Sequence, residues 1–214
     1  MFKTRKDNFQ KKIDVEKLIK LNLELENKID ENGDLNPFEG NKDCLLYISK
    51  HKNGFAFYFN HNIPSSIREE LKKINPEKIL KGDEIAKGIF NEFIPCKKIK
   101  TFVSCYFIDT PSTSEFSDVI QVKNAFVIRK DNKNVSSAWA QEENEQAIEL
   151  AVETLPDYQK RGYGKQVVAA CTYDAMTKGK IAFYSYEIDN VTSAALAKSL
   201  GVIQYAQSTA YSSN

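Results

Sequence analysis

The sequence predicts a mixed α/β fold, in which helices cover one sheet. Apolar residues recur at the spacing of an amphipathic helix near the N-terminus, and three short strand-like runs follow one another between residues 125 and 154. The last run leads through a glycine-containing turn into another amphipathic helix. Strands that alternate with helices in this way favour a mixed sheet over an all-α or all-β protein. Hydrophobic residues are 42% and charged residues 28% of the chain, as in ordinary globular proteins.

The N-terminal quarter is predicted to hold a helix followed by a hairpin. Isoleucine and leucine at spacings of three to five predict an amphipathic helix over residues 13–29, ended by the turn at residues 30–34. Residues 44–48 and 55–59 are predicted to be strands, because they flank the turn sequence Asn53-Gly54.

Two more helices and a strand are predicted before the middle of the chain. One helix begins after Pro64, with Ser66 and Glu69 as a capping box, and the segment 75–77 (Asn-Pro-Glu) opens the next. Residues 102–108 are predicted to be a strand. This half of the sequence contains no recognisable catalytic constellation.

The C-terminal half is predicted to begin as an antiparallel meander. Its strands are expected at residues 125–129, 135–141 and 147–154, separated by polar turns. A helix over residues 164–178 and a strand over residues 181–188 then follow. Trp139, the single tryptophan, is expected to pack in the core.

The turn between the third strand and the helix has the pattern of a phosphate-binding loop. Residues 154–165 read Thr-Leu-Pro-Asp-Tyr-Gln-Lys-Arg-Gly-Tyr-Gly-Lys. Two glycines in a Gly-x-Gly spacing let successive N–H groups point into one concavity, and the N-terminus of the following helix adds partial positive charge. The expected guest is a pyrophosphate.

Two common phosphate loops do not fit this segment. A P-loop requires a serine or threonine after Gly164-Lys165, where this chain has Gln166, and a first glycine where it has Gln159. A dinucleotide fingerprint requires a third small residue three positions after Gly164, where this chain has Val167.

What remains is Gln-x-x-Gly-x-Gly, formed by Gln159, Gly162 and Gly164. This motif resembles the coenzyme A pyrophosphate loop of the GNAT N-acetyltransferase superfamily. A second segment, residues 189–202, is similar to another GNAT signature, Asn-x-x-Ser/Ala followed by a helix that ends in Leu-Gly-Phe, although its last residue here is Val202. The resemblance therefore rests on two motifs in the expected order, and it implies a GNAT acyl-CoA N-acyltransferase fold with an elaborated N-terminal half.

The resemblance implies acetyl-CoA as the co-substrate and suggests which residues hold it. In relatives the strands before and after the loop splay apart, and the pantetheine arm adds itself between them like an extra strand. The implied contacts are Val152 and Thr154 for the arm, the loop residues Gln159, Lys160, Arg161, Gly162, Tyr163, Gly164 and Lys165 for the phosphates, and Asn190 and Ser193 at the next helix. The alternative for the last two is structural: Asn190 or Thr192 caps the helix, and Ser193 is a small packing residue.

The implied reaction is the direct attack of a primary amine, on a small molecule or a protein, on the acetyl thioester. Relatives that use a tyrosine as the acid carry it seven residues after the motif asparagine, and this chain has Ala197 there. The candidate bases are Glu149, Glu153 and Glu187, and the candidate acids are Tyr205 and Tyr211. Glu153 and Tyr205 are the pair put forward here, although strand alternation turns Glu149 and Glu153 away from the face of Val152 and Thr154. The competing interpretation is that the glutamates are solvated and the tyrosines are edge residues.

The missing tyrosine leaves a second hypothesis, a non-catalytic acyl-CoA-binding module of GNAT fold. Gly201 is followed by 13 residues, too few for the usual closing pair of strands, so the acceptor pocket is expected to be completed by the N-terminal half or by a second subunit in a homodimer. We expect two regions, residues 1–115 and the GNAT half 116–214, with the polar segment 110–115 at the boundary. The third hypothesis is an interaction protein that uses the N-terminal helix.

Charge and cysteine content exclude other classes of function. The formal net charge is +1, so nothing predicts binding to nucleic acid or to a membrane surface. The four cysteines and two histidines are scattered, which predicts no metal site. With neither a signal-peptide pattern nor a long apolar run, the expected location is the cytoplasm.

Overall fold

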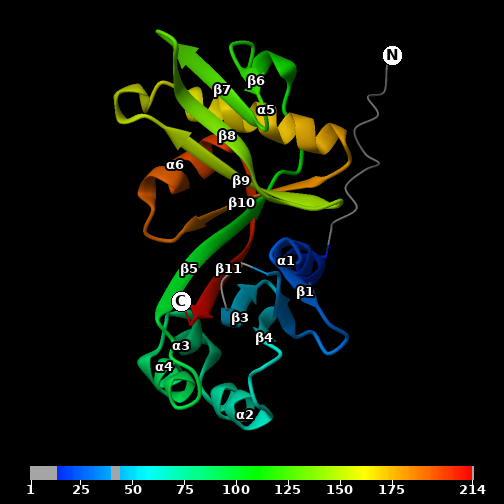
Figure 1. Ribbon diagram of the computed structural model, residues 1–214, viewed down its shortest axis with the longest axis vertical. Coiled ribbons are helices and arrows are strands. Elements are labelled where there is room, and N and C mark those ends of the chain that lie inside the picture. The colour runs from blue at the N-terminus through cyan, green and yellow to red at the C-terminus, as the bar shows by residue number, and fades with distance from the viewer. Residues whose placement is uncertain (1–13, 40–43, 214) are drawn as a thin grey trace, which may run out of the picture.

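The computed structural model describes residues 14–39 and 44–213, and its main feature is one large mixed sheet (Figure 1). In the described residues this sheet has nine strands, in the order β4 (Gly54–Phe59), β3 (Cys44–His51), β11 (Ile203–Ser212), β5 (Lys98–Tyr106), β10 (Ile181–Glu187), β9 (Ala147–Thr154), β8 (Lys133–Glu143), β7 (Ala125–Lys130) and β6 (Ile120–Val122). Only β9 and β10 are parallel neighbours, and each other neighbouring pair is antiparallel. The predicted mixed α/β class is confirmed.

Helices and a small hairpin cover this sheet. The helices are α1 (Val15–Leu23), α2 (Ser65–Lys73), α3 (Pro76–Leu80), α4 (Glu84–Asn91), α5 (Tyr163–Thr177) and α6 (Val191–Leu200), with short 3₁₀ turns at Thr113–Glu115 and Pro156–Tyr158. The hairpin pairs β1 (Asn27–Ile29) with β2 (Leu35–Pro37). Figure 1 shows α5 and α6 beside β7 to β10, and α2 to α4 at the opposite end of the molecule.

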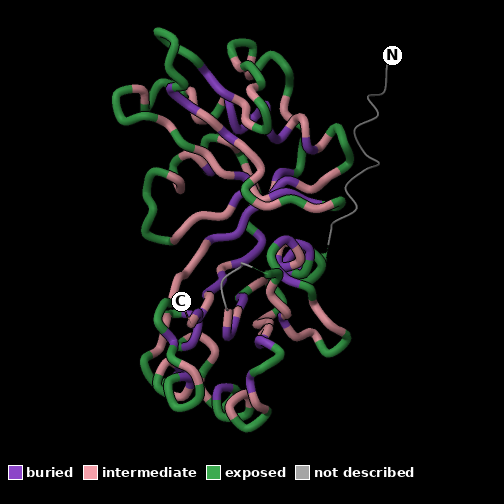
Figure 2. The backbone as a smooth tube through the Cα atoms, viewed as in Figure 1, coloured by how far each residue is buried: buried purple, intermediate pink, exposed green. Residues whose placement is uncertain are grey.

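Three hydrophobic clusters hold these layers together. The first joins α5 and α6 to one face of β7–β10 through Val168, Ile148 and Leu150. The second packs α2, α3 and α4 against β3 and β11. The third packs α1 against β9, β10 and β11, with Leu18 and Phe183 nearly fully buried. Figure 2 shows the buried segments along the central strands and in the inner parts of the helices. Helices therefore lie on both sides of the central strands.

A strand from the N-terminal half completes the C-terminal half of the sheet. β5 pairs with β10 from Phe102 to Tyr106 and with β11 along its whole length. The two strands that flank α6 in sequence are thus separated in the sheet by a strand that comes from before residue 116. The sheet consequently runs without interruption across the boundary expected at residues 115/116.

Most predicted elements of the C-terminal half are confirmed, and several of the N-terminal half are wrong. The helix expected over residues 13–29 ends at Leu23, because Asn27 turns its side chain back to donate to the Leu23 carbonyl (3.0 Å) and then begins β1; Ile13 lies outside the described residues. The capping box of Ser66 and Glu69 is also wrong, because α2 begins at Ser65 with Pro64 as its N-cap and no capping side chain.

Three further differences concern single elements. The strand expected over residues 102–108 runs over Lys98–Tyr106, and α4, capped by Asp83, was not predicted. Trp139 is only partly buried and lies outside the three hydrophobic clusters of the described residues. It occupies the face of β8 opposite Ala138 and Ala140, which pack beneath α5.

Candidate functional site

The sheet opens between β9 and β10. Their parallel ladder joins Ala147–Glu149 to Ile181–Phe183 and extends no further in the described residues, yet β9 continues to Thr154 and β10 to Glu187. Beyond Glu149, β9 stays paired with β8, and β10 stays paired with β5. The two strands therefore leave a wedge in the sheet, with unpaired backbone edges on both sides.

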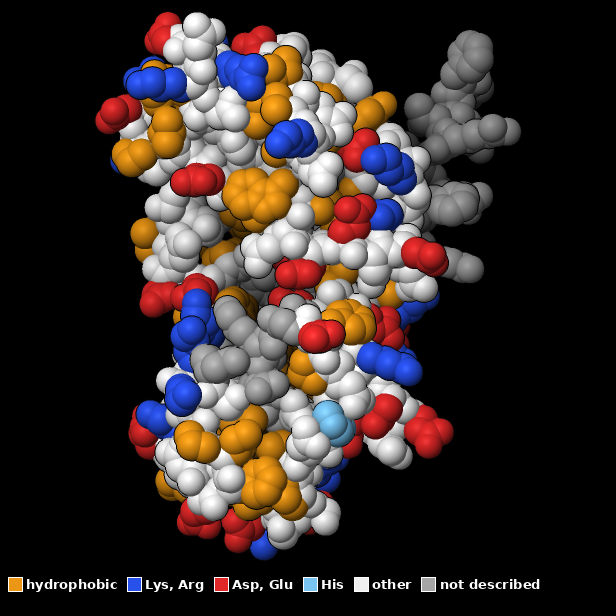
Figure 3. Space-filling view, viewed as in Figure 1, with side chains coloured by type: hydrophobic (Ala, Val, Ile, Leu, Met, Phe, Trp, Pro, Cys, Tyr) orange, Lys and Arg blue, Asp and Glu red, His pale blue; other side chains and the backbone are white. Residues whose placement is uncertain are grey.

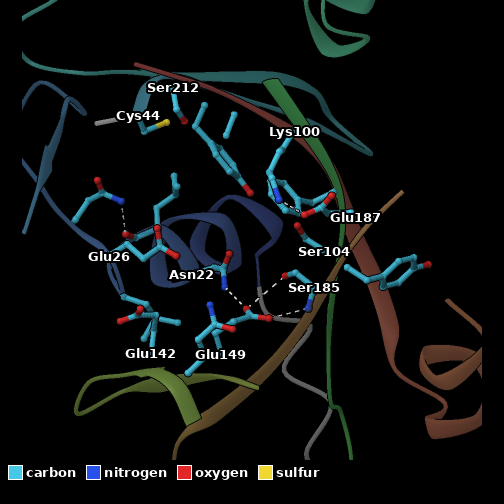
Figure 4. Close-up of a pocket in the computed structure, with 18 of the residues that line it drawn as sticks. Asn22, Glu26, Cys44, Lys100, Ser104, Glu142, Glu149, Ser185, Glu187 and Ser212 are labelled. Atoms are coloured by element: carbon cyan, nitrogen blue, oxygen red, sulfur yellow. Dashed lines mark hydrogen bonds and ion pairs between the residues drawn. The ribbon is translucent and has the colours of Figure 1, made fainter. Parts of the chain in front are cut away.

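A cavity of about 420 Å³ lies at this opening (Figure 4). Asn22 of α1 lines it from one face of the sheet, whereas Asn190 and Ser193, at the start of α6, line it from the other. Strands β3, β5, β8, β9, β10 and β11 supply the walls. Because residues from both faces line one cavity, the space reaches through the sheet at the point where the strands part.

Glu149 is the central ionisable group of this cavity. Its Oε1 accepts a hydrogen bond from the Ser185 N–H (2.7 Å), and its Oε2 accepts from the Asn22 Nδ2 (2.8 Å) and from the Ser185 hydroxyl (3.3 Å). Figure 4 shows these contacts joining β9, β10 and α1. Burial, with a smaller contribution from the nearby Glu26, raises the pKa of Glu149 to about 7 even though the hydrogen bonds from Ser185 and Asn22 oppose the shift. A carboxyl with this pKa can accept a proton near neutral pH.

The two side chains put forward from the sequence as base and acid lie elsewhere. Glu153 is exposed on β9, and Tyr205 is buried in the third cluster against the rings of Tyr106 and Phe183. Neither is among the described residues that line the cavity. Burial raises the pKa of the Tyr205 phenol well above its usual value, which makes the phenol a weaker proton donor. The structure brings together Glu149, Asn22 and Ser185 instead.

The phosphate-type loop lies at the far end of β9. Gly162 has φ +80°, a conformation that other L-residues rarely adopt, and it is the N-cap of α5. Gly164 is required for a different reason: a Cβ there would lie 3.3 Å from the Thr154 Oγ1 and 3.6 Å from a Leu196 methyl. The two glycines therefore shape the turn and allow α5 to pack closely on β9 and α6.

This turn presents backbone donors and basic side chains. The first hydrogen bond at the start of α5 joins the Gln166 N–H to the Gly162 carbonyl, so the preceding N–H groups point out of the helix end. Arg161 lies over the Tyr158 ring (5.2 Å), and Lys130 of β7 lies over the Tyr163 ring (5.8 Å). Lys160 has φ +59°, which turns the chain before Gly162. Lys165 lines a second cavity of about 150 Å³ with Asp109 and Leu200. These features suit an anion.

Gln159 of the loop and the residues expected to contact the pantetheine arm have structural partners. Gln159 donates its Nε2 to the Thr154 carbonyl (3.2 Å), and the Thr154 hydroxyl bonds the Ser136 hydroxyl (2.8 Å). Val152 packs against the first cluster. Asn190 caps α6 by accepting from the Ser193 N–H (3.0 Å). Although they form this cap, Asn190 and Ser193 also line the cavity.

Sequence reasoning missed Asn22 and Ser185 as partners of Glu149. A polar residue on a helix or strand carries no signal for a partner that is 127 or 36 residues away in sequence. Glu149 itself had a usable signal, because it interrupts the apolar run Ile148, Leu150 and Ala151. An acidic residue in such a strand is costly to bury unless it is hydrogen-bonded.

Neither a metal-binding group nor a membrane-spanning helix is found in residues 14–39 and 44–213. No group of three or more histidine, cysteine or acidic side chains there could hold a metal ion. No helix in that part of the chain is long and apolar enough to cross a membrane.

Comparisons with known proteins identify relatives of the C-terminal half. Residues 127–211 match the family model described as FR47-like protein, which is GNAT-related. This stretch contains β8 to β11, the loop and both C-terminal helices. No curated protein sequence matches the chain.

The chain is also similar to solved structures of GNAT proteins. One from Novosphingobium aromaticivorans is 14% identical over 55% of this chain and 67% of its own, with a TM-score of 0.47. A GNAT acetyltransferase from Colwellia psychrerythraea is 10% identical over 87% and 80% of the two chains (TM-score 0.44). An N-acetyltransferase-like protein from Streptococcus suis is 16% identical over 78% and 82% (TM-score 0.43). These likenesses are too distant for any residue-by-residue correspondence.

Proposed function

Since residues 127–211 of this chain are related to the GNAT superfamily through the FR47-like family, we propose that the protein is an N-acetyltransferase that transfers the acetyl group of acetyl-CoA to a primary amine. One observation carries the proposal: β9 and β10 part at a partly buried, hydrogen-bonded carboxylate, and the strand that leads away from it ends in a glycine loop suited to phosphate. The arrangement offers one place for a thioester and another for its phosphates.

Two features of the chain suit acetyl-CoA as a substrate: the glycine-shaped turn and the wedge between β9 and β10. At the end of β9, the glycine-shaped turn and the N-terminus of α5 suit a pyrophosphate, with Lys160, Arg161 and Lys165 nearby. In the wedge, the unpaired edges of β9 and β10 suit the amides of an extended pantetheine arm. The acetyl thioester would then reach the cavity that contains Glu149.

Glu149 is the residue that we propose as the general base. An alkylammonium with a pKa of about 10.4 must lose a proton before it can attack. The Glu149 carboxylate takes this proton, the amine nitrogen forms a bond to the acetyl carbonyl carbon, and the carbon–sulfur bond breaks. The nitrogen loses its second proton, the thiolate takes up one proton and leaves as free coenzyme A, and the products are an amide and a thiol. Asn22 and Ser185 hold the carboxylate in the opening throughout.

Ligand binding is the first test. Acetyl-CoA at a hundredfold excess over its Kd should raise the free energy of unfolding by about 2.7 kcal/mol, whereas ATP and NAD should have little effect. Gly162→Asp should abolish this shift, because it places a negative charge in the loop. Gly179→Asp is the matched control: Gly179 has φ +79° at the other end of α5, and its backbone strain is therefore similar. Equal shifts in the two variants would place acetyl-CoA elsewhere.

Turnover is the second test. Free thiol should be released from acetyl-CoA in the presence of amines, and Glu149→Gln should lower kcat by about 10²- to 10⁴-fold. Glu153→Gln, on the same strand but exposed, should leave kcat nearly unchanged. If Glu153→Gln lowers kcat and Glu149→Gln does not, Glu153 is the base after all.

The non-catalytic acyl-CoA-binding module remains the competing function. Ala197, at the position where relatives carry a tyrosine acid, is buried in the first cluster and has no titratable group. A protein that binds acetyl-CoA tightly but releases no thiol with any amine of a broad panel would be such a module.

A further inference from the structure

The cavity at the opening carries more negative than positive side chains. Among its described lining residues, the carboxylates are Glu26, Glu142, Glu149 and Glu187, and the ammonium groups are Lys98 and Lys100. Lys100 forms an ion pair with Glu187, so these two charges neutralise each other on the β5–β10 wall. Figure 3 shows acidic side chains gathered around the middle of the face on view. The wall made by β8 and β9 is therefore the acidic side of the cavity.

An irregularity in β8 places a second carboxylate beside Glu149. The β8–β9 register pairs Ala140 with Leu150 and then Glu142 with Glu149, so that Gln141 is an extra residue in β8. Without this bulge, Gln141 would be the cross-strand neighbour of Glu149. Bulges commonly re-aim side chains next to functional sites.

The side chains of Glu142 and Glu149 point into different parts of the cavity. Figure 4 shows Glu149 turned toward Ser185 and β10, and Glu142 turned away from them. Glu149 already has three hydrogen-bond donors. Glu142 therefore marks a second anionic position, away from the place where the attacking nitrogen would lie.

Apolar side chains also line the cavity. Leu23, Leu25 and Leu150 line the cavity and are nearly buried. A methylene chain could lie along this surface while its charged ends reach the carboxylates.

A buried hydroxyl gives independent evidence for a polar ligand. Ser104 of β5 is 1% exposed and lines the cavity, directly across the ladder from Ser185. Its Oγ makes no hydrogen bond of ordinary geometry with any described residue, although the phenols of Tyr47 and Tyr205 lie close enough for it to affect their pKa values. In Figure 4 its oxygen lies in the cavity between Ser185 and Glu187. Even with these phenols nearby, the Ser104 oxygen has lone pairs that can accept from an N–H donor of a ligand.

We propose that the acceptor site takes an alkyl diamine, with one amino group at Glu149 and a second cationic group at Glu142. This inference rests on the proposed function, because it treats the cavity as the acceptor site of the same reaction. Lys100 and Glu187 neutralise each other's charge, so Glu187 is not the partner assigned to the second cationic group. Ser104 offers its oxygen as a hydrogen-bond acceptor to the bound ammonium. The volume of about 420 Å³ suits a small molecule.

The test is calorimetric binding of three ligands of the same length to the full chain: 1,4-diaminobutane, n-butylamine and 4-aminobutanoate. They share one amine and differ only in the group at the other end, which is cationic, neutral or anionic. The diamine should bind about tenfold more tightly than butylamine, and this preference should shrink as salt is added. The anionic ligand should bind most weakly.

Two variants locate the second cationic group. Glu142→Gln should reduce the preference for the diamine over butylamine to about twofold or less, because it removes the proposed charge partner. Glu145→Gln, in the exposed turn between β8 and β9, removes the same charge outside the cavity and should leave the preference unchanged. A loss of preference in both variants would show a long-range charge effect and would overturn the assignment to Glu142.

The remaining outcomes are also decisive. Equal binding of the diamine and butylamine would overturn the inference, as would tighter binding of 4-aminobutanoate, which would instead indicate an amino acid held by Lys98. Absence of binding by all three ligands, with and without saturating acetyl-CoA, would show that the cavity is not an acceptor site for such amines. If the diamine binds as expected but acetyl-CoA neither binds nor releases thiol, the ligand class stands and the proposed transferase function fails.

Discussion

Glu149 shows how one residue can be stabilised and destabilised by the same environment. Burial disfavours the charged carboxylate, whereas the donors Asn22 and Ser185 favour it. The effect of burial is larger, and the pKa therefore rises from 4.5 to about 7. The folded protein therefore binds a proton at this site more tightly than the unfolded chain does. Stability must depend on pH as a consequence.

The first prediction concerns the stability of Glu149→Gln as a function of pH. The raised pKa means that the wild type loses stability as pH rises from about 4.5 to about 7, by up to about 1.4 kcal/mol per pH unit, and that no further loss occurs above this range. The variant lacks this loss, and the Asn22 amide can turn to offer its oxygen to the new amide. As the pH rises from 4.5 to 7, the free energy of unfolding of the variant should therefore increase relative to that of the wild type.

Urea unfolding at a series of pH values measures this difference. Glu153→Gln is the control, because Glu153 is exposed on the same strand and should show a nearly constant difference from the wild type. A difference between Glu149→Gln and the wild type that does not change with pH would mean that the carboxyl titrates normally in the folded protein.

At the scale of single residues, the sequence allows prediction of the loop but not of the carboxylate's partners. Gly162 and Gly164 could be recognised by their Gly-x-Gly spacing, although only Gly162 has a positive φ, and Gly164 instead allows close packing against the Thr154 and Leu196 side chains. Glu149 could be weighed only as one glutamate among several. Its importance depends on Asn22, which tertiary packing of α1 brings to it from 127 residues away. The opening of the sheet, which selects Glu149 over Glu153, has no signature in either strand.

At the scale of elements, β11 is held to the helical end of the molecule by its side chains. Tyr211 is fully buried, donates its hydroxyl to the Ile79 carbonyl of α3 (2.6 Å), and packs against the Phe90 ring (5.6 Å between centroids). Thr209 makes a similar bond to the Leu80 carbonyl. The Ile79 carbonyl also accepts from the Gly82 N–H (3.0 Å), so the Tyr211 hydroxyl is a second donor to it at the end of α3.

The second prediction follows from the Tyr211 hydroxyl. Tyr211→Phe keeps the ring but removes one of the two donors to the Ile79 carbonyl, the other being the Gly82 N–H, and it should lower the free energy of unfolding by about 0.5–1.5 kcal/mol. Tyr173→Phe is the control, because Tyr173 is only partly buried and its ring contacts Phe116. Chemical denaturation of both variants measures the effect. An equal, small loss in the two would mean that another donor replaces the Tyr211 hydroxyl.

The elements that the sequence predicted well are those with strong local signals. β9, α5 and β10 are runs rich in apolar residues and are bounded by turns with glycine or asparagine. The helix over residues 13–29 was predicted too long because Leu25 and Ile29 continue the helical spacing, although Leu25 is buried in a turn and Ile29 belongs to β1. There, pairing of β1 with β2 and the turn at Asp30 outweigh the helical pattern.

At the scale of the whole molecule, β5 links the two halves of the chain. We proposed a division at residues 115/116, with an N-terminal region and a GNAT half. Both regions contribute to one sheet, since β5 lies between β10 and β11, and β11 in turn pairs with β3. Removing either half would break the backbone ladder of the other. The division is thus one of sequence motifs, and the physical unit is the sheet.

The last prediction is that the chain unfolds in one cooperative transition. Two buried cysteines report on opposite ends: Cys96 lies in the second cluster with α2–α4, and Cys171 lies on α5 in the first. Because β5 and β11 connect these clusters through a continuous ladder, both thiols should become reactive at the same urea concentration. Pulse labelling followed by peptide mass analysis measures each thiol separately. Tyr211→Phe supplies the decisive comparison, since it removes a bond at the α3 end and should move both midpoints together. Two separate midpoints, with only that of Cys96 shifted by the variant, would instead show that the halves are independent folding units despite the shared sheet.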